Sequence, residues 1–204
     1  MSSPLNGTRI AIIGHRSADL EGVAQGIPEN FTVSIAYDDE LSYEFAEFAA
    51  VVVAVSAHQG APNTLIKAWE EICEFQIPRA IVITEIESPD ADFDEAVLIV
   101  RRMFGEGITP FLVLHSDDGT PCAFIDLETM KIRDYSSGTL EIKESESDHQ
   151  VIVQEFRDEY LADIAGLEEP RFATGLFVPI LPFSAKLHLG SNELVGYLKQ
   201  VIES

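Results

Sequence analysis

Short, nearly continuous apolar runs recur along the chain at the length of single strands. They are rich in Ile and Val, which is typical of strands buried on both faces of a sheet. The runs occupy residues 9–13, 31–36, 50–55, 80–83, 111–114 and 176–181. We expect these six segments to form the main sheet of the protein.

Amphipathic stretches, with apolar residues three and four positions apart, separate several of these runs. One follows Pro62, and a second begins after Asp92, a residue type that caps helix N-termini. Two more lie at 153–164 and 194–202, the last with Ser191 as its expected cap. The stripe of the third comprises Val153, Phe156, Tyr160, Leu161 and Ile164. Since parallel strands need crossover connections, the alternation predicts an α/β fold of three layers, a mostly parallel sheet with helices on both faces.

The alternation is interrupted at 123–143, where short strands and turns follow one another, and an acidic segment comes next at 144–148. The simplest explanation is a small inserted α+β subdomain. We therefore expect a single domain over residues 1–204, with the insertion at about 120–172 and a closing strand and helix at 175–204.

The charge balance narrows the classes of partner. The 204 residues include 35 Asp and Glu against 13 Lys and Arg, a net charge of −22, while 46% are hydrophobic. A chain of this hydrophobicity can fold around a core, so the acid excess does not indicate disorder. It does argue against binding nucleic acid through a basic face and against an anionic membrane surface. With no membrane-spanning run or apolar leader, we expect a soluble cytoplasmic protein.

The chain lacks the usual signatures of a metal or nucleophilic site. Cys73 and Cys122 have no metal-type spacing and each lies in an apolar run, so we interpret them as core thiols. We find no Ser-His-Asp arrangement, cysteine nucleophile signature or zinc pattern. We therefore expect no metal ligands.

In an open α/β sheet, ligands bind beyond the carboxyl ends of the strands. The turn after the first run, residues 14–21, reads GHRSADLE. Together with the preceding strand it resembles the start of the GTP-binding (G) domain of elongation factor G and its translational GTPase relatives, whose phosphate loop reads GHVDAGKT. Residues 50–69, 77–93, 123–131 and 179–190 are similar to the same family in the same order.

The resemblance implies a P-loop NTPase-like fold with a subdomain inserted in the G domain, and a role in protein biosynthesis. Gly14 and His15 match the phosphate loop, but Asp19 stands for its second glycine, Leu20 for its lysine and Glu21 for its threonine. The lysine neutralises phosphate and the threonine hydroxyl binds Mg²⁺. Each added carboxylate within about 4 Å of a phosphate costs on the order of 1 to 4 kcal/mol. We expect this turn not to bind a triphosphate.

The guanine-recognition motif Asn-Lys-x-Asp is altered as well. Its four positions are Thr84, Glu85, Ile86 and Glu87. Glu87 keeps a carboxylate that is one methylene longer, whereas Glu85 reverses the charge of the lysine. The family's closing Ser-Ala element is retained, as Ser184 and Ala185 followed by Lys186.

The hydrolytic parts are also changed. The stretch before residue 31 leaves room for one short helix and not for a first switch loop. Residues 37–41 read YDDEL where the family has DTPGH, so that Tyr37 replaces the metal-facing Asp, Glu40 the Gly and Leu41 the His.

Two minor alternatives concern polar residues at strand ends. Asp38, Asp39 and Glu40 form either a Mg²⁺-binding cluster or a solvated turn, and we favour the turn. His15 and His58 are either general bases or structural residues of turns, and we favour the structural role.

Two functions follow from the resemblance. The first is a catalytically inactive G domain, a pseudo-GTPase that serves as a structural or protein-interaction module, for example at the N-terminus of a larger translation-factor-like protein. It would need no cofactor, and its partners would be the ribosome, a basic ribosomal protein or further domains of the same protein. The alternative is a weak GTP- or GDP-binding domain acting on the ribosome, with Mg²⁺ as its cofactor.

Overall fold

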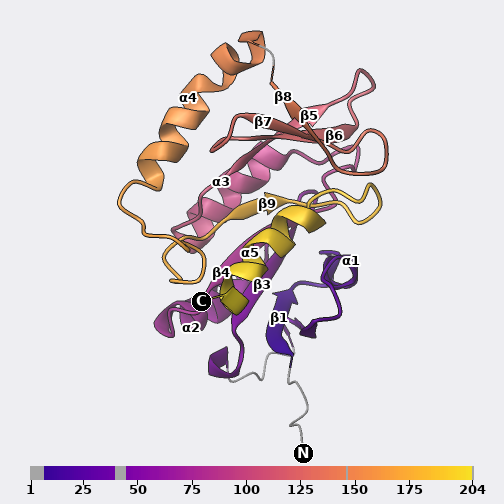
Figure 1. Cartoon of the computed structure of the whole chain (residues 1–204). Coiled ribbons are helices and arrows are strands. Elements are labelled where there is room, and N and C mark those ends of the chain that lie inside the picture. Colours follow the sequence, from indigo (N-terminus) through magenta and orange to yellow (C-terminus); the bar gives the residue numbers. More distant parts are fainter. Residues whose placement is uncertain (1–6, 40–44, 146, 204) are drawn as a thin grey trace, which may run out of the picture.

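The main sheet has five parallel strands in the order β2-β1-β3-β4-β9 (Figure 1). The structure is a computed structural model that describes residues 7–39, 45–145 and 147–203. The strands are β1 (Thr8–Gly14), β2 (Phe31–Tyr37), β3 (Ala50–Ser56), β4 (Arg79–Thr84) and β9 (Ile180–Pro182). All residues of β3 and β4 are buried, as their continuous apolar runs predict. The predicted α/β class with a mostly parallel sheet is confirmed.

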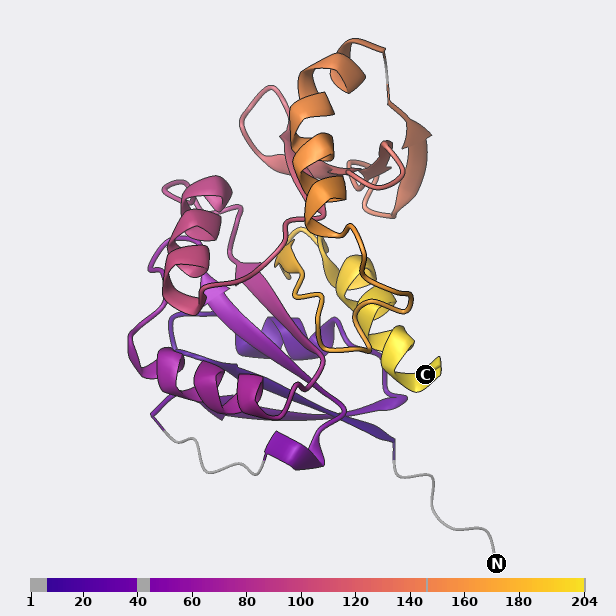
Figure 2. The ribbon, with the colours of Figure 1, turned by 90° about the vertical axis from the view of Figure 1, so that its left-hand side faces the viewer.

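Four helices flank this sheet, and a short 3₁₀ helix (Phe45–Glu47) precedes β3. They are α1 (Leu20–Gln25), α2 (Thr64–Glu74), α3 (Phe93–Phe104) and α5 (Ser191–Glu203). Figure 2 shows α2 and α3 on one side of the sheet and α1 and α5 on the other. The predicted cap of α3 is confirmed, since the carboxylate of Asp92 accepts a hydrogen bond from the amide of Glu95 at 2.9 Å. Ser191 is the first residue of its helix rather than its cap.

A second, antiparallel sheet lies beyond β9 in the order β5-β6-β7-β8, with α4 (Ser147–Asp163) beside it (Figures 1 and 2). Its strands are β5 (Phe111–His115), β6 (Pro121–Asp126), β7 (Lys131–Asp134) and β8 (Glu141–Glu144). This sheet and α4 form the part of the molecule that we call the outer lobe, residues 111–163.

The sequence-based placement of residues 111–114 in the main sheet was wrong, because β5 pairs antiparallel with β6. Ile108 makes only a single bridge to Pro179 at the edge of the main sheet before the chain departs. Pro110 follows and has no amide hydrogen with which to extend that pairing. The run at 176–181 likewise yields a shorter strand, Ile180–Pro182.

A buried polar cluster joins the outer lobe to α5. Glu193, in the first turn of α5, has a fully buried side chain and pairs with Arg133 of β7 at 2.5 Å. Both of its carboxylate oxygens also accept the hydroxyl of Tyr135, at 2.7 Å. Burial and the charge of Glu193 raise the pKa of Tyr135, so the hydroxyl remains a donor. The charge of Glu193 is thus neutralised and hydrogen-bonded inside the molecule.

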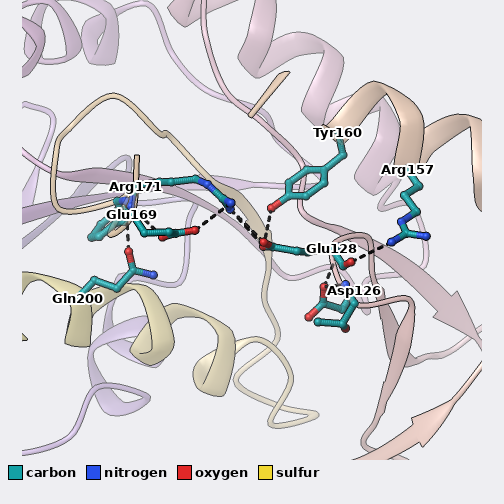
Figure 3. A network of polar contacts seen from close by, with 9 residues as sticks. Asp126, Glu128, Arg157, Tyr160, Glu169, Arg171 and Gln200 are labelled. Atoms are coloured by element: carbon teal, nitrogen blue, oxygen red, sulfur yellow. Dashed lines mark hydrogen bonds and ion pairs between the residues drawn. The ribbon is translucent and has the colours of Figure 1, made fainter. Parts of the chain in front are cut away.

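A second polar network links the outer lobe to the segment that returns from α4 to the main sheet (Figure 3). The carboxylate of Glu128, after β6, pairs with Arg171 at 3.2 Å and accepts the hydroxyl of Tyr160 at 3.2 Å. Arg171 also pairs with Glu169 at 2.9 Å. The next amide, that of Phe172, donates to the side chain of Gln200 near the end of α5 at 3.2 Å. The segment that returns from α4 to the main sheet is therefore bonded both to the outer lobe and to α5.

Of the helices in the described residues, none combines the length and the apolar composition that crossing a membrane requires.

Candidate nucleotide site

The turn between β1 and α1 is held tightly against β3. A Cβ atom at Gly14 would lie 2.6 Å from the carbonyl oxygen of Ala54, too close for any side chain. It would also lie 3.0 Å from a methyl carbon of Leu20. Gly14 is therefore required by packing alone, without reference to a phosphate.

Asp19 occupies the place where a phosphate loop would present its helix to an anion. Its carboxylate caps α1 and accepts a hydrogen bond from the amide of Gly22 at 2.9 Å. First-turn amides of a helix are the groups that bind phosphate in loops of this kind. Here the chain supplies its own anion to them, and a Cβ at Gly22 would lie 2.1 Å from that carboxylate.

Leu20, for which the resemblance predicts the position of a phosphate-binding lysine, is completely buried. Its side chain covers Gly14 and belongs to the hydrophobic core. A charged amine could not occupy this position without a large desolvation cost.

Glu21 faces solvent and is bonded to the end of β2. Its carboxylate accepts the hydroxyl of Tyr37, and this bond lowers the pKa of Glu21. The guanidinium of Arg16 lies 4.3 Å from the centre of the Tyr37 ring and 3.5 Å from Asp39. Tyr37 thus ties β2 to the β1–α1 turn. Glu40 and Leu41 lie outside the described residues.

The end of β4 contacts the same turn. Thr84 is buried, donates to the carbonyl of Val55 at 3.3 Å and accepts the amide of Asp19 at 3.3 Å. Glu85 has a positive φ of 61° and accepts a hydrogen bond from the hydroxyl of Ser56 at 2.9 Å. The sequence reasoning missed Ser56, although its place at the carboxyl end of β3 could have indicated it.

Glu87 differs from its neighbours in one respect. One of its carboxylate oxygens is inaccessible to solvent and has no hydrogen-bond partner within the described part of the chain. It lies two residues beyond Glu85, in the turn that leads to α3. An oxygen of Asp38, after the end of β2, is likewise inaccessible and has no hydrogen-bond partner among the described residues.

The loop from β9 to α5 lies against α1, on the other side of the candidate site. Ser184 is buried, exchanges two backbone hydrogen bonds with Leu189 at 3.1 and 2.9 Å, and its hydroxyl accepts the amide of Leu187 at 3.0 Å. Ala185 packs against α1, with its methyl 2.7 Å from the place of a Cβ at Gly22. Lys186 points into solvent.

The structure therefore brings three of the predicted segments together: the β1–α1 turn, the end of β4 and the β9–α5 loop. Their polar groups bond largely to one another. The β1–α1 turn presents a capped helix, a buried leucine and two carboxylates, those of Asp19 and Glu21.

The other candidates are ordinary structural groups. A ring nitrogen of His15 lies 2.8 Å from the hydroxyl and accepts the amide of Ser17, within a tight turn, and His58 is an exposed turn residue. Cys73 and Cys122 are free, partly buried thiols, and burial raises the pKa of Cys73 to about 11, which keeps it unreactive. No cluster of three or more His, Cys, Asp or Glu with metal-binding geometry occurs within the described ranges.

Comparison with known proteins shows sequence similarity to proteins named as translation factors. The chain is 26% identical over 198 residues to an elongation factor G-like protein of Mycobacterium tuberculosis, covering 83% of this chain and 27% of the relative. It is 24% identical over 125 residues to the mitochondrial ribosome-releasing factor 2 of Drosophila sechellia, covering 58% of this chain and 18% of the relative. The chain thus spans about a quarter or less of the length of these relatives. No family model matches it.

The fold is also found in a solved structure. A crystal structure of a Thermus thermophilus protein matches 97% of this chain and 40% of its own, with a TM-score of 0.69 and 17% sequence identity. At this identity the match establishes the fold alone, and it covers the outer lobe as well as the main sheet.

Proposed function

We propose, from its similarity to an elongation factor G-like protein and to ribosome-releasing factor 2 and from its fold, that this chain is an elongation factor G-like G domain and a pseudo-GTPase. In this role it binds no nucleotide and serves as a structural or protein-interaction module. Because it spans 27% of its Mycobacterium relative, we further propose that it acts together with other domains of a larger translation-factor-like protein. That protein would work on the ribosome in the cytoplasm.

One observation carries the proposal: the carboxylate of Asp19 bonds the helix amide that a phosphate would need. The neighbouring Leu20 is buried over Gly14 instead of reaching toward a ligand. The N-terminal end of α1 is thus already bonded to a carboxylate of the chain itself. The lysine charge that would offset the charge of the phosphates is missing. Binding a nucleoside triphosphate would require Asp19 to leave α1 and would set the phosphates against Asp19 and Glu21.

Thermal unfolding with and without nucleotide tests the proposal. A ligand at 100 times its dissociation constant adds about 2.7 kcal/mol to the free energy of unfolding. We expect no rise in Tm with millimolar GTP or GDP and Mg²⁺ beyond that with ATP and Mg²⁺, which controls for ionic strength. A rise that is specific to GTP and GDP would contradict the proposal.

The weak-binding alternative is favoured by a separate observation, the unbonded and inaccessible carboxylate oxygen of Glu87. An N–H donor of a guanine base would supply the partner that this buried oxygen lacks. In that case GDP would bind in calorimetry and Glu87→Ala would abolish the binding. Glu95→Ala, which removes an exposed carboxylate from α3, is the matched control.

A further inference from the structure

An apolar groove runs between α3, β5 and α4, on a part of the molecule away from the β1–α1 turn. It consists of two adjoining cavities of about 260 and 430 Å³. Both are lined by Asp94 of α3, Leu112 of β5 and Phe156 of α4. Residues of α3 supply one wall, and residues of β5 and α4 in the outer lobe supply the other.

The walls of this groove carry large apolar side chains that the fold itself does not cover. Leu98 of α3 is 65% exposed, and Ile152 and Phe156 of α4 are 71% and 50% exposed. The sequence places Phe156 in the same stripe as Val153 and Tyr160, both of which are buried. Ile152 and Phe156 are four residues apart and thus neighbours on one face of α4, where they form a continuous apolar surface that an amphipathic helix could cover.

The groove is rimmed by acidic side chains. Asp94 lies in the first turn of α3, and Glu159 and Asp163 lie on the last turns of α4. The basic residue in the lining, Arg101, is already engaged: its guanidinium donates to the carbonyl of Gly107 at 3.0 Å and lies 3.6 Å from Glu159. The net charge offered to an incoming segment is therefore negative.

We propose that this groove binds a basic amphipathic helix of a partner protein. The apolar stripe of that helix would cover Leu98, Ile152 and Phe156, and its Lys and Arg side chains would meet Asp94 and Asp163. A second copy of this chain is disfavoured as the occupant, because two molecules of net charge −22 repel each other. The proposal does not depend on whether the β1–α1 turn binds nucleotide.

A set of synthetic peptides tests the chemistry of the occupant. The probe is a fluorescein-labelled helical peptide of Leu, Ala and Lys in which the leucines recur every three and four residues. One control has the same composition with the leucines spread around the helix, and another has Glu in place of Lys. By fluorescence anisotropy we expect the probe to bind at least about tenfold more tightly than either control, and less tightly as salt is added.

Variants of the protein locate the binding. We expect the double change Leu98→Ala and Phe156→Ala to weaken the probe's binding about tenfold. Phe75→Ala, which removes another exposed aromatic ring (56%), should leave the affinity unchanged. Asp94→Asn with Asp163→Asn should reduce the salt dependence, whereas Glu70→Gln with Glu71→Gln on α2 should not.

Four results would overturn the proposal. They are failure of the basic probe to bind, equal binding of a control peptide, and equal loss of affinity in Phe75→Ala and the groove variant. The fourth is a dimer in sedimentation analysis that Phe156→Ala dissociates, which would make a second copy the occupant. Circular dichroism melts of each variant establish that it is folded before the affinities are compared.

Discussion

Asp19 and Leu20 are adjacent in the chain but lie in opposite surroundings. Asp19 sits at the surface end of α1 with its carboxylate bonded to the backbone, whereas Leu20 is sealed beneath the same turn. Both conformations are local consequences of the residue types, since Asp is a strong helix cap and Leu gains free energy on burial. Together they give the turn a stable structure that needs no ligand.

Restoring the family's lysine should therefore destabilise the protein rather than create a phosphate site. We expect Leu20→Lys to lower the free energy of unfolding by about 3 kcal/mol or more, because it buries an amine without a partner. Urea unfolding measures the change. Leu98→Lys, at an exposed helical position, is the control and should alter stability by only about 0.5 kcal/mol. Equal stability of Leu20→Lys and the wild-type chain would show that Leu20 is not sealed in the core.

At the scale of elements, periodicity predicted the strands of the main sheet well and the outer lobe less well. β3 and β4 are continuous apolar runs because both of their faces are buried, and such runs are recognisable in a sequence. β5 is also an apolar run, yet it belongs to the other sheet. An apolar run indicates that a strand is buried, but it does not indicate which strand it pairs with.

The candidate site could likewise be predicted only in part. Its segments could be located from the strand ends, but the bonds between them, such as Asp19 to Thr84 and Ser56 to Glu85, join residues far apart in the sequence. No spacing along the chain indicates that these groups bond to each other.

The β7–β8 hairpin provides a prediction about pH. The side chain of Lys143 donates to Asp134 at 2.5 Å, and this bond is the main reason that the pKa of Asp134 falls to about 2. A lowered carboxyl pKa stabilises the fold above about pH 4, and this contribution is lost as the pH falls from there toward 2. We expect the carboxyl carbon of Asp134 to titrate near pH 2 by NMR, and Lys143→Met to move its midpoint upward toward pH 4.

Lys131→Met provides the control for this titration. It removes a second ion pair of the same hairpin, between Lys131 and Glu144 at 3.3 Å, without touching Asp134. The midpoint of Asp134 should then remain near pH 2. If Lys131→Met and Lys143→Met shift it equally, general charge and not the specific bond determines the pKa.

For the whole molecule, the charge of −22 is the dominant long-range property. The acids at Asp19 and Glu193 are hydrogen-bonded within the fold, but others, such as Glu70 and Glu71, lie exposed on helix faces where they repel one another. Such repulsion opposes the compact state and is reduced by salt.

We therefore expect Tm, measured by circular dichroism, to rise by several degrees between low and physiological ionic strength. NaCl and KCl should act alike, because screening does not depend on the identity of the cation. Replacing Glu70, Glu71 and Glu74 of α2 with Gln should reduce the slope. A Tm that is constant or falls with added salt would contradict this explanation.

The two polar connections to α5 have a mechanical consequence. Glu193 and Gln200 are seven residues apart, about 10 Å along the helix axis, and each ties α5 to the outer lobe or to the segment returning from it. A body held at two separated points cannot pivot about either one. We therefore expect the outer lobe to move together with α5, and not as a flap hinged at one contact.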